Sequence, residues 1–157
     1  MQILDGKAVA AFHRERVERR LDDLKERLIT PELAIICIGD DKPSQMYAKS
    51  MKRVALDVGI AAEIYAMDSA VTETEILAMI ESFNQNEAIF GILLTMPMPK
   101  HINAQRIIRA ISPDKDIDGL TDTSVANLFN GRAGFVPCTP RAVISILDYY
   151  HISLFGK

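Results

Sequence analysis

Three acidic residues at alternate positions, followed by a glycine, form the most chemically suggestive stretch of the sequence: Asp114, Asp116, Asp118 and Gly119. This spacing matches the first half of a calcium-binding EF-hand loop, but Val125 occupies the position of the bidentate glutamate. No clear pair of EF-hand helices flanks the stretch, so calcium binding is disfavoured. Two interpretations stay open: a solvated acidic turn, or a carboxylate that points into a cleft and accepts hydrogen bonds from a ligand.

The segment before these acids would place them at the edge of a sheet. The apolar run Ile89–Leu94 has the length and β-branched character of a strand buried on both faces. Thr95 ends the run, and Pro97 and Pro99 lack the N–H groups that a continuing strand would need. Ligands of α/β sheets bind beyond the carboxyl ends of the strands. We therefore place the functional site in the segment from Phe90 to Gly119.

The other reactive side chains form no recognisable metal or phosphate motif. The three histidines have no metal-ligand spacing, and the two cysteines form neither a disulfide framework nor a metal-binding pair: His13, His101, His151, Cys37 and Cys138. The histidines are interpreted as surface or packing residues. No phosphate-binding glycine loop of the G-x-G-x-x-G or G-K-[ST] type is present. The sequence therefore predicts no metal site.

Composition limits the classes of function. The chain has 157 residues, 48% of them hydrophobic, with a net charge of −3 and a pI near 5.6, which suits a single domain. The acidic balance argues against a nucleic-acid partner, and no apolar run approaches the roughly 20 residues of a membrane span. The N-terminal MQILDGKAVA lacks the features of a signal peptide. We expect a cytoplasmic protein that binds neither nucleic acid nor membrane.

The first predicted element is a long amphipathic helix from Ala8 to Leu28. Basic residues in HRERVERR are interrupted by acids, so a solvated helix face is favoured over a nucleic-acid patch. Apolar residues recur at helical spacing and form the predicted inward stripe: Val9, Phe12, Val17, Leu21, Leu24 and Leu28.

Strands and helices alternate along the rest of the chain. Strands are predicted at Leu33–Ile38, Ala61–Met67 and Ile89–Leu94, and they are separated by helices. The predicted helices are Ser44–Val58, one that starts with a capping box at Thr72 and Glu75, a short one after Asn103, and Ala142–Tyr150. A polar loop is expected after Gly119. This alternation predicts an α/β fold, a three-layer αβα domain with a small, mainly parallel sheet.

Tyr47 lies on the predicted Ser44–Val58 helix, close to the expected edge of the sheet. A lone tyrosine is by default a core or half-buried residue, but its ring could also stack on a flat ligand. The residues alone indicate an α/β domain with a polar cleft at the strand ends, and they do not define its substrate.

Four ordered stretches carry a resemblance to a known family: PSQMYAKSMKRVALDVGI, GILLTMPMPKHI, SPDKDIDGL and PCTP. The chain resembles the bifunctional methylenetetrahydrofolate dehydrogenase/methenyltetrahydrofolate cyclohydrolase family from LDGKAVA onward. The resemblance implies that residues 1–157 are the N-terminal folate-binding catalytic domain, acting on tetrahydrofolate in one-carbon metabolism. The Rossmann domain that follows in the family, and that binds NADP or NAD, is absent from this sequence. The resemblance leaves a homodimer open for the full-length proteins.

The resemblance also assigns residues to the site. Tyr47 matches the tyrosine that stacks on the folate, Asp118 matches the aspartate that hydrogen-bonds the pterin end, and Pro97 belongs to the same substrate-binding set. The catalytic lysine of the family falls on Met51, and the glutamine that positions that lysine falls on Thr95.

Lys52 is the candidate substitute for the missing lysine. At about 100° per residue, however, it is rotated away from the helix face that Tyr47 and Met51 share. Smaller departures from the family pattern occur at Ser124, Ala126 and Ala142. Two hypotheses follow. The chain is a one-carbon catalytic domain that acts with its nucleotide domain and is inactive alone, or a non-catalytic relative that binds a folate-like ligand or a protein partner.

Overall fold

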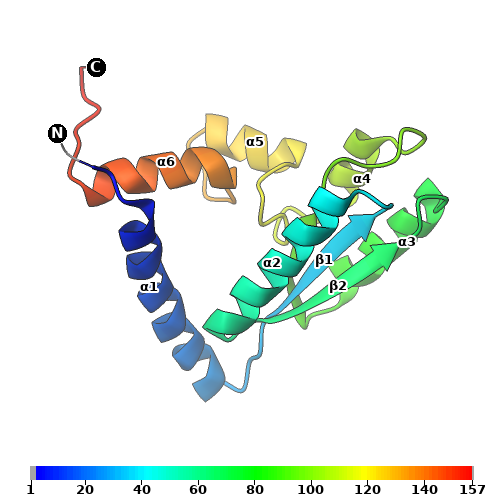
Figure 1. Cartoon of the computed structure of the whole chain (residues 1–157), viewed down its shortest axis with the longest axis horizontal. Helices are drawn as coiled ribbons and strands as arrows, with labels where there is room; N and C mark the ends of the chain where they lie inside the picture. The colour runs from blue at the N-terminus through cyan, green and yellow to red at the C-terminus, as the bar shows by residue number, and fades with distance from the viewer. Residues whose placement is uncertain (1–2, 157) are drawn as a thin grey trace.

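Three parallel strands form the centre of the fold (Figure 1). The structure is a computed structural model that describes residues 3–156. Strand β1 (Glu32–Ile38) lies between β2 (Ala61–Met67) and β3 (Ile89–Leu94), and both neighbours run parallel to it. These strands confirm the predicted sheet, with β2 and β3 at the predicted bounds.

Helices cover both faces of this sheet, as the predicted three-layer αβα fold requires (Figure 1). Helices α3 (Glu73–Gln85) and α4 (Ala104–Ala110) pack on one face, and α2 (Lys42–Val58) packs on the other. Side chains alternate between the two faces along β1, because successive residues of a strand point in opposite directions. Ala34, Ile36 and Ile38 contact α3 and α4, whereas Ile35 and Cys37 contact α2.

Local sequence signals account for the ends of these helices. The Asp41 carboxylate accepts a hydrogen bond from the backbone N–H of Ser44 and caps the start of α2. The helix ends at Gly59, whose φ of 92° is the left-handed conformation typical of a glycine after a helix. Thr72 and Glu75 form the predicted capping box of α3.

Two expectations about the C-terminal third are wrong. The segment predicted as a polar loop contains α5 (Asp122–Phe129), capped by Thr121. Its eight residues make only about two turns, too few for a periodic pattern to be recognised. Helix α6 (Cys138–Tyr149) begins four residues before the predicted Ala142. Pro140 falls in its first turn, where the missing N–H would have no partner within the helix.

Helix α1 (Gly6–Glu26) is present as predicted, but most of its apolar stripe is not buried. Within that stripe only Val9 and Leu21 are buried, whereas Phe12, Val17 and Leu28 are exposed. The reason is that α1 packs on α6 and on one end of α2 rather than on the sheet (Figure 1). None of the helices described in residues 3–156 combines the length and apolar character of a membrane span.

Candidate ligand-binding site

A cavity of about 760 Å³ lies between α1 and α2, beside the sheet. Most of its wall is apolar, with Val17 from α1, Val54 and Val58 from α2, and Leu33 and Leu93 from the sheet. Its polar residues include three that could act on a ligand: Tyr47, Asp118 and Cys138. Met51 belongs to the same wall.

The helical repeat of α2 explains which of its residues reach the cavity. Tyr47, Met51 and Val58 are separated by four and seven residues, so they share one face of the helix. Lys52 is turned away from that face, and its ammonium lies 2.8 Å from the Glu63 carboxylate of β2. The ammonium lowers the pKa of Glu63. In this arrangement Lys52 is outside the cavity wall.

The segment that carries Asp118 is held against the edge of the sheet. The Ile92 N–H of β3 donates to the Lys115 carbonyl at 2.8 Å, and Ile92 also forms a parallel bridge with Asp116. The Asp116 carboxylate is only 1% exposed. It accepts hydrogen bonds from the Leu120 N–H at 3.0 Å, the Thr121 N–H at 2.8 Å and the Ser124 hydroxyl at 2.7 Å.

This network corrects the interpretation of residues 114–118 as a solvated acidic turn. Burial acts to raise the pKa of Asp116, but the donated hydrogen bonds outweigh it and lower the pKa below its usual value. Asp116 is therefore a buried structural carboxylate, whereas Asp118 lines the cavity. No group of acidic, histidine or cysteine side chains suited to a metal ion occurs in residues 3–156.

Gly119 fixes the turn against the start of α6. Its φ of 64° favours glycine, and a Cβ at this position would lie 2.8 Å from the Pro137 nitrogen. Its own N–H donates to the Asp116 carbonyl at 2.9 Å. The Cys138 thiol, at the first position of α6, donates to the Ile117 carbonyl at 3.6 Å. The turn thereby connects the sheet, the cavity and α6.

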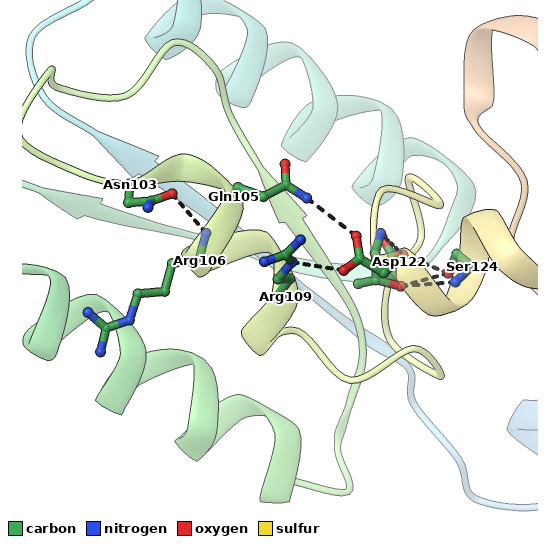
Figure 2. Close-up of polar contacts among 8 residues, drawn as sticks. Asn103, Gln105, Arg106, Arg109, Asp122 and Ser124 are labelled. Carbon is green, nitrogen blue, oxygen red and sulfur yellow. Dashed lines mark hydrogen bonds and ion pairs between the residues drawn. The ribbon is translucent and has the colours of Figure 1, made fainter.

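Polar contacts at the surface join α5 to α4. Figure 2 shows the Arg109 guanidinium directed at the Asp122 carboxylate, 2.8 Å away, and Gln105 beside it. Both partners of the ion pair are largely exposed, so it contributes little to stability. Ser124 has dashed contacts of its own in the same view, and its hydroxyl donates to the buried Asp116 carboxylate. The buried hydrogen bonds, rather than the surface pair, hold α5 in place.

Two titratable side chains of the cavity wall, Tyr47 and Cys138, lie near the Asp118 carboxylate. Burial and the nearby negative charge of Asp118 raise the pKa of Tyr47. Burial and Asp118 also raise the pKa of the Cys138 thiol. Both groups therefore stay protonated at neutral pH. The Tyr47 side chain is 48% exposed, so its ring is accessible to a ligand.

Thr95 and Pro97, like Lys52, are predicted site residues that lie outside the wall of this cavity. Thr95 is 2% exposed, and its hydroxyl has no hydrogen-bond partner in the described part of the chain. The adjacent Met96 carbonyl accepts a hydrogen bond from the Ser44 hydroxyl at 2.8 Å, which ties the end of β3 to the first turn of α2. Pro97 lines a separate cavity of about 280 Å³. The structure brings together Tyr47, Met51 and Asp118.

Two residues of the wall received no role from the sequence. His13 was interpreted as a surface or packing residue, and Cys138 as an unpaired cysteine. His13 lies four residues from both Val9 and Val17, so helical periodicity placed it beside the predicted stripe. For Cys138 no such signal existed, because its position depends on the contact between the start of α6 and the 115–119 turn.

These features define an α/β domain with an apolar cavity beside its sheet, and comparison with known proteins identifies its family. The chain belongs to the tetrahydrofolate dehydrogenase/cyclohydrolase family, whose catalytic-domain model matches residues 4–118. It is 38% identical over 156 residues to the bifunctional protein FolD of Staphylococcus epidermidis, covering 99% of this chain and 54% of that protein. The resemblance inferred from the four motifs is confirmed.

Solved structures agree with this assignment. The bifunctional FolD methylenetetrahydrofolate dehydrogenase/cyclohydrolase of Campylobacter jejuni superposes with a TM-score of 0.97 at 37% identity, covering 100% of this chain and 56% of that one. The FolD of Trypanosoma brucei, solved in complex with NADP and an inhibitor, gives a TM-score of 0.91 at 28% identity, covering 99% and 54%. The chain thus spans about half the length of these relatives.

Proposed function

We propose that this chain binds a reduced folate in the cavity between α1 and α2. The observation that carries the proposal is that Tyr47, Met51 and Asp118 share one cavity wall, although they come from α2 and from the 115–119 turn. The half-exposed Tyr47 ring can stack on the flat ring system, and apolar walls suit its faces. The Asp118 carboxylate can accept hydrogen bonds from the N–H groups of the pterin end.

The same wall has little capacity for acid–base catalysis. Opening the folate imidazoline ring requires proton transfers, and the Met51 thioether can neither donate nor accept a proton at neutral pH. Lys52 would have to break its ion pair with Glu63 and rotate around α2 to replace the missing lysine. Loss of a positioned acid–base group costs about 10² to 10⁴ in rate. We therefore propose folate binding with little or no cyclohydrolase activity.

Hydride transfer would need a further part of the protein. The sequence has no glycine-rich phosphate loop, and NADP is present in the structure of the longer Trypanosoma brucei relative. We propose that dehydrogenase chemistry with NADP or NAD requires a nucleotide-binding domain joined to this one, and that residues 1–157 alone do not bind NADP tightly. Calorimetry with NADP should show no saturable binding, and a micromolar dissociation constant would refute this part of the proposal.

A non-catalytic role is the second candidate. Two observations favour it: an apolar side chain at position 51 in the cavity wall, and a buried Thr95 that does not reach the wall. Under this alternative the cavity holds a folate-like ligand for a purpose other than catalysis, or the domain contacts a protein partner. A measurement of folate binding separates a ligand-binding role from a purely protein-binding one.

Binding is tested by titrating the chain with 5-formyltetrahydrofolate in a calorimeter. Replacing Tyr47 with alanine should weaken binding about tenfold, because stacking of two aromatic systems contributes on the order of 1 kcal/mol. Asp118→Asn should also weaken binding, since a charged acceptor forms stronger hydrogen bonds than an amide oxygen. Met46→Ala is the matched control, because Met46 lies on the same helix, is 71% exposed and is outside the cavity wall.

Catalysis is tested by following hydrolysis of 5,10-methenyltetrahydrofolate by the chain alone and by the chain joined to a nucleotide-binding domain of a relative. The wild type should be close to the uncatalysed rate, and Met51→Lys should raise the rate. Thr95→Gln is added second, because the buried Thr95 site must expand to accept a longer side chain. Wild-type turnover comparable to that of an ordinary family member would show that another group acts, and His13 in the cavity wall would then be tested before Lys52.

A further inference from the structure

The two outer edges of the sheet differ in what covers them. The outer edge of β3 is covered by the 115–119 turn, because the Ile92 N–H donates to the Lys115 carbonyl at 2.8 Å. Strand β2 forms the other outer edge, and no segment within residues 3–156 pairs with it there (Figure 1). We call it the β2 edge. An uncovered edge presents backbone N–H and C=O groups that can pair with a further strand.

The even-numbered residues of β2 carry the outward backbone groups of the β2 edge. At the two ends of the strand, the Ala61 N–H donates to the Pro31 carbonyl at 3.1 Å, and the Gly39 N–H donates to the Met67 carbonyl at 2.9 Å. Successive residues of a strand direct their backbone groups to opposite sides, so the odd-numbered residues bond β1. The strand contains no proline and pairs with β1 without a register shift. Its outer edge is therefore regular enough to accept another strand.

A hollow of about 260 Å³ lies beside this edge, between β2 and α2. Apolar residues of its wall include Ile64 and Ala66 of β2, Ala48 of α2 and Cys37 of β1. Ile64 and Ala66 thus provide outward backbone groups and one side of the hollow. Because successive side chains of a strand point to opposite faces, every second side chain of an added strand would face α2 and the hollow. Domains that bind peptides by strand addition combine an edge and side-chain pockets in this way.

Basic side chains of α2 border the hollow. Lys49 lines it, and Arg53 lies four residues further along on the same side of the helix. Neither side chain forms an ion pair in the described part of the chain. Lys52 is neutralised by Glu63. The α2 side of the β2 edge therefore carries a net positive charge.

The Glu63 side chain crosses the β2 edge. Glu63 is paired with Ala34, whose side chain contacts α3 and α4, so Glu63 starts on that face of the sheet. Its carboxylate nevertheless reaches Lys52 of α2 at 2.8 Å. The Lys52 ammonium and then the Ile64 N–H lower the pKa of Glu63. The carboxylate thus covers one outward N–H group, and an added strand must displace it.

We propose that the β2 edge binds an extended acidic segment of a partner protein, which adds a strand to the sheet and places an apolar side chain in the hollow. Backbone hydrogen bonds to β2 supply affinity, the hollow selects the apolar side chain, and Lys49 and Arg53 select acidic neighbours. Lys49 lies two residues after Tyr47 and so on nearly the opposite side of α2. The inference therefore does not depend on folate binding.

A second copy of this chain suits the β2 edge less well than an acidic segment. Antiparallel pairing of two β2 strands about a two-fold axis would place both α2 helices on the same face of the joined sheet. The unpaired Lys49 and Arg53 of each copy would then face like charges, which repel.

The test uses the fluorescently labelled peptide Thr-Glu-Thr-Val-Thr-Glu-Thr, with binding followed by fluorescence anisotropy at low salt. Its sequence reads the same in both directions, so the valine and both glutamates can face α2 whichever way the strand runs. It should bind at least about tenfold more tightly than Thr-Lys-Thr-Val-Thr-Lys-Thr, in which the charge is reversed. The acidic peptide with proline in place of valine should not bind, because proline lacks the N–H that pairs with β2.

Three variants of the chain examine the separate contacts. Ala66→Pro removes an outward N–H but no bond to β1, and it should weaken binding of the acidic peptide at least about tenfold. Lys49→Glu should weaken it about tenfold, because it reverses a charge at the hollow. Glu63→Ala should strengthen it about threefold, because the carboxylate no longer covers the edge. A gain in affinity is not expected from a residue whose role is only structural.

Arg20→Glu is the matched control for Lys49→Glu. Arg20 is an exposed residue of α1 that forms no ion pair within residues 3–156, and it lies outside the hollow. Its replacement makes the same change in net charge and should alter peptide affinity by less than about twofold. Urea denaturation checks that each variant is folded. Lys49 and Glu63 are exposed, so their variants test the inference even if Ala66→Pro does not fold.

Several results would overturn the inference. One is the absence of saturable binding of the acidic peptide to the wild type up to about 1 mM. Equal binding of the lysine peptide is another, and so is unchanged binding by folded Ala66→Pro or by Lys49→Glu. Sedimentation equilibrium examines the alternative occupant. A wild-type dimer that Ala66→Pro converts to monomers would assign the β2 edge to a second copy instead of an acidic partner.

Discussion

The two sides of the cavity between α1 and α2 are built in different ways. On one side are the sheet, α2 and the 115–119 turn, and on the other are α1 and α6 (Figure 1). Five of the seven residues of β1 are buried, whereas α6 contains no buried residue. The first side is positioned by packing and buried hydrogen bonds. The second side has few such constraints.

This difference in packing affects how firmly each side can hold a ligand-binding side chain. Stacking and recognition of a pterin ring need side chains held in fixed geometry, and the first side supplies Tyr47 and Asp118 from well-packed elements. Helix α6 has no comparable buried support, so its side chains are held in place less firmly.

The largest contrast should appear in amide hydrogen exchange of the chain. Amides of β1 exchange only when the sheet opens, whereas α6 can open locally because few buried contacts hold it. We expect β1 amides to exchange at least about a thousandfold more slowly than those of α6, measured by mass spectrometry or NMR. Similar protection of the two elements would show that α6 is part of the cooperative core, and would contradict the proposed difference in packing between the two sides.

The next largest effect is expected from Gly119→Ala. The new Cβ would lie 2.8 Å from the Pro137 nitrogen, and alanine is strained at a φ of 64°. We expect a loss of about 3 kcal/mol in the free energy of unfolding, measured by urea denaturation. Gly131→Ala is the control, because Gly131 has a φ of 62° but a Cβ there would meet no atom within 4 Å, so about 1 kcal/mol should be lost. Equal losses would show that contact with Pro137 is unimportant.

A smaller and pH-dependent effect is expected from Asp116→Asn. This change disrupts the buried network with Thr121 and Ser124, which should cost about 2 kcal/mol at pH 7. Because the pKa of Asp116 is lowered in the folded protein, its contribution is complete above about pH 4 and is lost as the pH falls through the folded value. The difference between variant and wild type should therefore shrink below about pH 4.

Asp114→Asn serves as the matched control for that experiment. Asp114 is an exposed acid in the same stretch and forms no hydrogen bond or ion pair through its side chain within residues 3–156. Its replacement should change the free energy of unfolding by less than about 0.5 kcal/mol at either pH. A loss at Asp116 that stays constant from about pH 7 to about pH 3 would contradict the assigned charge state.

The sequence predicted the elements whose pattern is local and strong. The bounds of β2 and β3 follow from short apolar runs that end at turn-forming residues, and the start of α3 follows from the Thr72 capping box. Helix α5 was missed because its stability depends on the buried Asp116 and on Thr121, which a periodic pattern does not reveal.

For the site, sequence reasoning identified residue types but not all of their positions. Tyr47, Thr95 and Asp118 were expected at one cleft, and the structure brings Tyr47 and Asp118, but not Thr95, into one cavity with Met51. Thr95 and Pro97 both follow the end of β3. Thr95 is nevertheless buried outside that wall, and Pro97 lines a separate cavity. The path of a chain after a strand is set by tertiary contacts, here the bond between Ser44 and the Met96 carbonyl. Such contacts leave no periodic pattern in the sequence.

The smallest effect, and the only gain in stability, is expected from Thr95→Val on the well-packed side. The Thr95 hydroxyl is buried without a partner within residues 3–156, and such a group costs free energy because it has lost its bonds to water. Valine has nearly the same shape as threonine. The free energy of unfolding of the variant, measured by urea denaturation, should therefore be about 1 kcal/mol higher than that of the wild type. Thr121→Val provides the contrast, because the Thr121 hydroxyl caps α5 and bonds Ser124, and its loss should destabilise by about 1 kcal/mol. Since Thr95 is outside the cavity wall, its replacement should leave the affinity for 5-formyltetrahydrofolate unchanged. A destabilised Thr95→Val protein with weaker folate binding would mean that the Thr95 hydroxyl contacts the ligand. Thr95 would then belong to the binding wall and not to the packed residues that support it.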